Sequence, residues 1–363
     1  MFFMKKIIIL LLTVLLIASK ARAQGCVIVR NISGFGQYNL KDKGFSMSSW
    51  QLNINNRYFK SFRDFKGTKD QHTPETEGHT IYSYTMDLSV TRMLSKGWSL
   101  SLSLPIAANT RWGSVEHGGA GTPRHSTSTF GIGDIRATAY KWLIHPSVKQ
   151  QWNLQIGLGL KLPTGDYKYQ DYFYRNDSTK VLAPVSAAIQ LGDGGTGIIT
   201  ELNSYYVFSN RKISLYGNFY YLLNPREQNG VSATFGRTPP PLLVKTGGDI
   251  NSVPDQYSIR AGVNLDFNRL LFSAGFRDEG IPVYDLIGGS DGNRRAGYNL
   301  SVEPGILYKM RKTSVYAYVP IIVSRNIKQT VPDKKENEYG NVNVLRPGGS
   351  PNYVVFLGVT FNF

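Results

Sequence analysis

Cysteine, long apolar runs and familiar catalytic motifs are all scarce in this chain of 363 residues. A single cysteine, Cys26, excludes an internal disulfide. After residue 23 no apolar run reaches the length of a membrane helix, so the mature chain is not expected to cross a membrane by helices. Neither a phosphate-binding loop nor a nucleophile elbow is present, so the sequence gives no support for a P-loop enzyme or an α/β-hydrolase.

Acidic residues are outnumbered, with 25 Asp and Glu against 41 Lys and Arg, a net charge of +16. Residues 1–23 read as an export signal: Lys5 and Lys6 precede a short apolar run, and Ala21-Arg22-Ala23 is a cleavage pattern. This segment holds four basic and no acidic residues, so the mature chain from Gln24 carries +12. For an exported chain the surplus favours anionic lipid or anionic solutes over nucleic acid. The residues before Cys26 match a lipidation signal poorly.

Apolar and polar residues alternate strictly in many segments of nine to twelve residues, such as 152–162 and 257–267. In the last of these segments Tyr353, Val355, Leu357, Val359, Phe361 and the terminal Phe363 share one face. A soluble antiparallel sheet also alternates. The length of the segments, and a regular exchange of short and long connections, favour instead a transmembrane antiparallel β-barrel with short periplasmic turns and long extracellular loops.

The expected architecture is an all-β barrel of about 12 strands over residues 46–363, preceded by residues 24–45 as a periplasmic segment or small plug. Strands are predicted at residues 46–59, 80–93, 98–106, 130–143, 151–163, 197–208, 213–222, 256–267, 270–277, 297–309, 314–323 and 352–363. The predicted long loops are residues 60–80, 107–129, 164–196, 223–255, 278–297 and 324–351.

Aromatic residues cluster at both ends of the predicted strands, as the interfacial girdles of a membrane barrel do. The girdle beside the short turns is expected to contain Trp98, Trp142, Trp152, Tyr206, Phe208, Phe267, Tyr308 and Phe363. The opposite girdle is expected to contain Tyr82, Tyr257, Tyr298 and Tyr353.

The same alternation directs a set of charged and aromatic side chains into the lumen. The expected charged residues are Asp87, Lys161, Glu201, Arg260, Asp266, Arg277, Glu303 and Lys309, with Asp134 and Arg136 as further candidates. Tyr216, Tyr220, Tyr316, Tyr318 and Phe356 are expected beside them and would give an amphipathic lining. These residues are the candidate solute path. A packed ion-pair network and an open watery channel are both compatible with the pattern.

Three short motifs follow one another on consecutive predicted strands: Leu104-Pro105-Ile106, Gly131-Ile132-Gly133-Asp134, and Leu162-Pro163-Thr164-Gly165-Asp166. This ordered set resembles the outer-membrane transporter family named for the meta-pathway of phenol degradation. The Gly-rich segment 191–197 is similar to a stretch of that family. The resemblance covers about residues 80–210 and implies a barrel that takes up small, often apolar molecules. It implies no catalytic residues.

The motifs also predict structure directly. Pro105 and Pro163 are expected near the outer ends of their strands, because proline has no amide hydrogen for the ladder. Gly131 and Gly133 are expected to let the fourth strand bend.

Enzymatic signals are weak. His145-Pro146-Ser147 faintly resembles the catalytic pair of outer-membrane phospholipase A, yet it falls in a predicted periplasmic turn. His72, His79, His117 and His125 lie in long loops without a metal-ligand spacing. No catalytic residue, metal site or cofactor is therefore predicted.

The sequence predicts a channel of the Gram-negative outer membrane that passes small, possibly aromatic or apolar, solutes without energy coupling. Expected partners are outer-membrane lipid and lipopolysaccharide, and the barrel-assembly machinery through Phe363. Two alternatives remain: a structural or adhesive barrel that binds surface polysaccharide or a partner through basic loops, and an outer-membrane lipid hydrolase.

Overall fold

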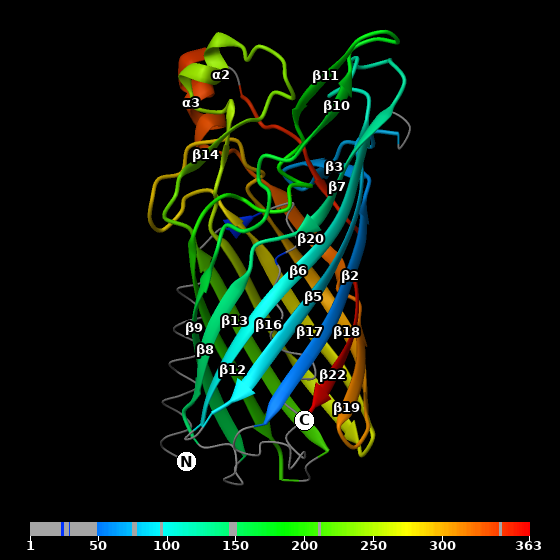
Figure 1. Cartoon of the computed structure of the whole chain (residues 1–363), viewed down its shortest axis with the longest axis vertical. Helices are drawn as coiled ribbons and strands as arrows, with labels where there is room; N and C mark the ends of the chain where they lie inside the picture. The colour runs from blue at the N-terminus through cyan, green and yellow to red at the C-terminus, as the bar shows by residue number, and fades with distance from the viewer. Residues whose placement is uncertain are drawn as a thin grey trace.

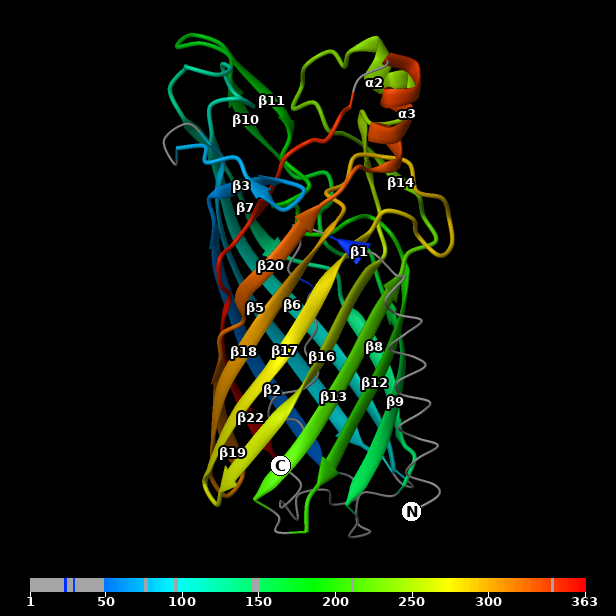
Figure 2. The ribbon, with the colours of Figure 1, turned by 180° about the vertical axis from the view of Figure 1, so that it is seen from behind.

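The strands of this protein form one closed antiparallel barrel, with most of the long connections gathered at one end (Figures 1 and 2). The computed structural model describes residues 23–24, 29, 49–74, 78–94, 97–144, 151–209, 212–340 and 343–363. Closure occurs because β17 pairs with β18, and β22 pairs with both β19 and β2. Among the described residues, no helix is both long and apolar enough to cross a membrane.

The barrel has 12 staves, two of which are interrupted, and this confirms the predicted fold class. The uninterrupted staves are β2 (Trp50–Ser61), β5 (Thr80–Met93), β6 (Trp98–Gly113), β9 (Trp152–Lys161), β12 (Gly197–Val207), β13 (Ile213–Leu223), β16 (Gln256–Phe267), β17 (Leu270–Pro282), β18 (Gly297–Lys309) and β22 (Val355–Asn362). The interrupted staves are β7 (His125–Ile132) with β8 (Arg136–Trp142), and β19 (Thr313–Tyr318) with β20 (Ile321–Ile327). β6 and β17 extend well beyond their predicted ends.

Both interruptions lie opposite a proline of the neighbouring strand. Pro105 accepts a hydrogen bond from the amide of Gly133 at 2.8 Å, and Pro304 accepts one from Val319 at 3.0 Å. Since proline cannot donate to the ladder, the partner strand loses its regular register there. Pro105 therefore does not lie near the end of its strand, as predicted, because β6 continues to Gly113. Pro163 does follow the end of β9, and Gly131 has the positive φ of 154° expected at a bend.

The long connections form a head at one end of the barrel, which contains strands and helices of its own (Figure 1). A small sheet joins β3 (Arg63–Lys66), β4 (Lys69–Asp70) and β21 (Gly348–Ser350). Two hairpins pair β10 (Gln170–Tyr174) with β11 (Lys180–Pro184), and β14 (Gln228–Ser232) with β15 (Ile250–Ser252). The helices α2 (Pro241–Lys245) and α3 (Val331–Gly340) complete the head, and the short β1 (Ala23–Gln24) pairs with β17.

The N-terminus of α3 is capped from both directions. The amide of Thr330 donates to Asp333 Oδ2 at 3.0 Å, and the amide of Asp333 donates to Thr330 Oγ1 at 3.3 Å. This reciprocal cap satisfies amides that have no partner within the helix. The guanidinium of Arg346 then binds both Asp333 and Glu336, which anchors the helix to the chain that returns to the barrel.

The two faces of the barrel wall differ as the alternation predicts. Outward side chains such as Leu102, Leu158 and Leu357 are more than half exposed, while their polar neighbours face inward. Inward hydroxyls pair across strands, for example Ser89 with Ser103 at 2.8 Å and Thr91 with Ser101 at 2.9 Å. An apolar outside with a polar inside is the arrangement of a membrane barrel.

The aromatic girdles are present with two corrections. Trp98, Trp152 and Phe363 are largely exposed on the outer surface, as predicted. Trp142 instead points inward, is 4% exposed, and packs against Tyr205 with ring centroids 5.8 Å apart. Tyr257 is also buried, and its hydroxyl donates to Asp278 Oδ1 at 3.4 Å.

Candidate functional site in the barrel interior

The structure places every predicted lumen residue on the inner face of the wall. All of the following are buried or half-buried: Asp87, Lys161, Glu201, Tyr216, Tyr220, Arg260, Asp266, Arg277, Glu303, Lys309, Tyr316 and Tyr318. Phe356 joins them at 2% exposure. The side chains divide into several groups at different levels of the barrel.

The central group is a chain of alternating charges across β16, β17 and β18. Glu303 Oε1 accepts from Arg260 Nε at 3.0 Å, and its Oε2 lies 3.6 Å from Arg277 Nη1. Arg277 Nη2 also donates to Glu279 Oε2 at 2.8 Å. All four side chains are at most 1% exposed, so the charges neutralise one another in a space that excludes bulk water.

The N-terminal region contributes to this group through Val29. The Val29 amide donates to Glu279 Oε2 at 2.9 Å, and its carbonyl accepts from Arg277 Nη2 at 3.1 Å. Val29 itself is buried against Ile199, Tyr220 and Leu222 on the inner wall. The remainder of the predicted plug, residues 24–45, lies outside the described residues apart from Gln24.

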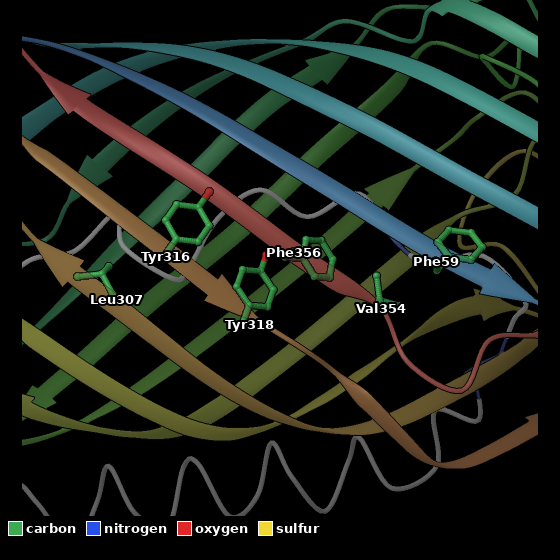
Figure 3. Close-up of a cluster of buried hydrophobic side chains, with 6 residues drawn as sticks. All are labelled: Phe59, Leu307, Tyr316, Tyr318, Val354 and Phe356. Carbon is green, nitrogen blue, oxygen red and sulfur yellow. The ribbon is translucent and has the colours of Figure 1, made fainter.

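An aromatic stack lies inside the barrel (Figure 3), next to the central charges. The rings of Tyr318 and Phe356 are parallel within 11°, with centroids 4.4 Å apart, and Tyr316 lies next to Tyr318 at 6.1 Å. The guanidinium of Arg260 lies 5.2 Å from the Tyr318 ring, and that of Arg277 lies 5.4 Å from Phe356. At these distances a cation is attracted to the face of an aromatic ring. The interior at this level is packed.

Three inward tyrosines lie flat because each faces a glycine on the next strand. Tyr316 pairs in register with Gly358, Tyr140 with Gly157, and Tyr216 with Gly262. A Cβ at any of these glycines would collide with the facing tyrosine. The missing side chains therefore create slots that hold the rings against the wall.

A second charged group lies where the motifs meet. Lys161 forms an ion pair with Asp193, and its Nζ lies 3.9 Å from Asp134 Oδ2. The amides of Gly165 and Asp193 donate to the two oxygens of Asp134 at 3.0 and 3.3 Å. We call these four residues the motif knot. Asp193 was not among the predicted lumen residues, since its segment could be read only as a turn.

A third group surrounds Arg136, whose guanidinium lies 5.7 Å from the Tyr220 ring, with Asp87 and Glu201 close enough to interact. Glu201 also accepts from the Tyr140 hydroxyl at 3.2 Å. Near the short turns, Lys309 donates to Asp266 Oδ2 at 2.9 Å. The predicted inner charges are therefore mostly paired, which corresponds to the packed network rather than the open channel.

The loop histidines form no metal centre, and no group of three metal-binding side chains occurs among the described residues. His79 lies 3.2 Å from Glu116, which also binds Arg111. Burial, and then the positive charge of Arg111, lower the pKa of His79 to about 4. Burial opposes ionisation of Glu116, but Arg111 and His79 outweigh it and hold the pKa of Glu116 below its usual value. His145, Pro146 and Ser147 lie outside the described residues.

Comparison with solved structures supports the fold. The chain is similar to an outer membrane channel from Pseudomonas putida F1, with 12% identity, a TM-score of 0.59, and coverage of 91% of this chain and 100% of that one. It also matches the translocator domain of autotransporter NalP from Neisseria meningitidis at 10% identity, with a TM-score of 0.44 and coverage of 88% and 89%. A third match is a mutant of the monoaromatic hydrocarbon channel TodX, at 9% identity, with a TM-score of 0.42 and coverage of 94% and 97%.

No protein-family model matches the sequence, and no curated protein matches it. At 12% identity the similarity to the Pseudomonas putida channel establishes a shared barrel fold, and no more.

Proposed function

We propose that this protein is an outer-membrane channel that passes small molecules, with a preference for apolar or aromatic ones. The carrying observation is the interior of the barrel, where tyrosine and phenylalanine rings stand among charges that are mostly paired. A wide water-filled pore would leave such charges hydrated. A narrow lining of ring faces offers apolar solutes contacts that small ions lack.

The packed interior also constrains the mechanism. With Arg260, Arg277 and Glu303 all at most 1% exposed, a solute moves along the axis only when these side chains or their neighbours shift. Passage would then be slow for ions. It would favour molecules that can contact the aromatic rings in place of the side chains that have moved.

The resemblance to the phenol meta-pathway family supports the same solute class, and the similar channel from Pseudomonas putida has the same fold. In this proposal residues 1–23 are a cleaved signal and the barrel resides in the outer membrane of a Gram-negative cell. Lipopolysaccharide surrounds it, and the barrel-assembly machinery recognises Phe363. No enzymatic activity is proposed.

Liposome swelling and planar-bilayer conductance test this function. Phe356→Ala removes a ring of the central stack and should raise both solute flux and conductance. Phe276→Ala is the matched control, since that ring is 62% exposed on the outer surface of β17. If neither the wild type nor Phe356→Ala passes any tested solute in either assay, the proposal is wrong.

An adhesive role is the second candidate, favoured by the folded head. The small sheet, hairpins and helices of the long connections form a built surface, as a receptor for a polysaccharide or protein requires. Loop-dependent binding to cell-surface polysaccharide, together with a closed barrel in the flux assays, would favour this function over transport.

A further inference from the structure

The outer surface of the barrel carries a groove near the end with the long connections. It spans β2, β5, β6 and β7, which lie side by side on the front of the barrel in Figure 1, and it encloses about 340 Å³. We call it the outer trough, defined by Tyr58, Tyr82, Tyr84, Ala108, Thr110 and Phe130. A volume of this size falls within the usual range for small-molecule sites.

Strand register explains the shape of the trough. Tyr84, Ala108 and Phe130 occupy one row across β5, β6 and β7, and the next row contains Tyr82, Thr110 and Ser128. The small side chains of β6 thus lie between the aromatic side chains of β5 and β7. These two strands are about 10 Å apart. The ladders beneath these rows are continuous, so the trough is a depression in an unbroken wall.

Some of the polar atoms in the trough are hydrogen-bonded. The Tyr84 hydroxyl donates to Asn56 Oδ1 at 2.6 Å, and the Thr110 and Ser128 hydroxyls lie 3.0 Å apart. The side chains of Tyr58, Tyr82 and Tyr84 are exposed at its surface. Phe130 is 71% exposed there. The trough is continuous with the apolar belt of the barrel, so the molecules that reach it are lipid chains.

The end of the trough nearest the head is positively charged. Lys60 pairs in register with Tyr82, and its Nζ lies 5.5 Å from the Tyr82 ring. Arg124 donates to Thr80 Oγ1 at 2.9 Å, one step further along the same face of β5. Among the described residues, the carboxylate hydrogen-bonded to the trough lies on its far side, where Asp171 accepts from the Ser128 amide at 2.8 Å. An anionic group therefore fits beside β2 and β5.

We propose that the outer trough binds one acyl chain of a phosphate-bearing lipid in the leaflet nearest the head, with its phosphate beside Lys60 and Arg124. The site is separate from the barrel interior and does not depend on solute passage. It would fix a lipid molecule against this wall.

Native mass spectrometry of the mature, detergent-folded chain tests the site, with lipid A as the probe. Lipid A freed of its phosphates tests the charge, and inorganic phosphate tests whether the anion alone suffices. We expect lipid A to bind best, the dephosphorylated form to bind several-fold more weakly, and inorganic phosphate to remain unbound. Equal binding of the two lipids, or binding of inorganic phosphate, would overturn the assigned headgroup contact.

Ala108→Phe should fill the trough and weaken lipid A binding by about tenfold or more, equivalent to about 1.4 kcal/mol. Its control is Ala139→Phe, because Ala139 lies between Leu100 and Leu158 on β8, outside the trough. Lys60→Gln should weaken only the phosphorylated lipid. Its control is Lys141→Gln, since Lys141 lies 5.2 Å from the Trp98 ring at the opposite rim.

Heat-modifiable mobility in gels reports whether each variant folds. If Ala108→Phe fails to fold, Phe130→Ala takes its place, because this exposed ring can be removed without disturbing the interior. Unchanged lipid A binding by a folded Ala108→Phe or Phe130→Ala protein would refute the proposal.

Discussion

Removal of the central carboxylate is the sharpest test of the packed interior. Glu303 lies between two arginines, with Arg260 Nε at 3.0 Å and Arg277 Nη1 at 3.6 Å. In Glu303→Gln only Glu279 would remain to balance both guanidinium groups, which leaves a buried net positive charge. Breaking a buried pair in this way costs about 3–5 kcal/mol. Arg260→Gln should cost a similar amount, because Glu303 then loses its nearest partner.

The double variant Arg260→Gln/Glu303→Gln should be much less destabilised than the sum of the two singles. Charge balance is restored in it, since Arg277 keeps Glu279 at 2.8 Å. The coupling free energy from the double-mutant cycle should therefore reach about 2–3 kcal/mol. The assay is reversible urea unfolding of the barrel in lipid vesicles, followed by tryptophan fluorescence.

A different interior would give a different result. In a water-filled lumen these charges would be hydrated and screened, and each single variant would cost less than about 1 kcal/mol, as exposed pairs do. Additive effects of that size would refute the packed network, and with it the view that side chains must move before a solute passes.

Three further changes follow from the same contacts. Gly358→Ala should lower the free energy of unfolding by about 1–3 kcal/mol, because the new methyl group overlaps the Tyr316 ring, and Tyr316→Leu should relieve most of that loss in the same urea assay. Lys161→Met should leave Asp134 and Asp193 buried without their cation, and limited proteolysis should then cut residues 162–196 faster than in the wild type. His117 is fully buried, and this burial lowers its pKa from 6.5 to about 4. As the pH falls, His117 is therefore protonated at a higher pH in an opened head than in the closed head. The head should therefore lose up to about 3 kcal/mol of stability as the pH falls from 6.5 to 4, visible as faster hydrogen exchange near His117 but unaffected by His72→Gln.

Sequence alone predicted the strands best where lipid dictates the pattern. β5, β16 and β18 were placed to the residue, since each alternates over its full length. β6 was predicted to stop at residue 106 but reaches Gly113, and its last residues face the head on one side. There Ala107 is fully buried and Arg111 binds Glu116, so neither face keeps a uniform character. Alternation disappears where hydrocarbon no longer requires it.

Inside the barrel, the sequence predicts the face on which a residue lies but does not predict which residues contact one another. A period of two was sufficient to direct Arg260 and Glu303 inward. Their contact depends on register across three strands, because Gly275 of β17 lies beside Glu303 and carries no side chain to separate it from Arg260. The head was read as loops because its small sheet, hairpins and helices depend on contacts between distant segments. Trp142 faces inward because it shares a face of β8 with Arg136 and Tyr140, a consequence of the same period that the girdle prediction overlooked, and it packs there against Tyr205.

The motifs behind the family resemblance have a structural role, and this role is distinct from the solute selection proposed for the aromatic stack. Thr164 Oγ1 accepts from the Ile135 amide and donates to the Gly133 carbonyl, both at 2.9 Å. Gly165 binds Asp134, and Asp134 adjoins Lys161 and Asp193 in the motif knot. These contacts all lie where β7 departs from the regular wall and β9 ends, so the motifs hold that wall together. The aromatic stack of Tyr316, Tyr318 and Phe356 lies outside every motif. Solute preference should therefore respond to changes in that stack, whereas Thr164→Val should weaken the wall and leave the order of preferred solutes unchanged.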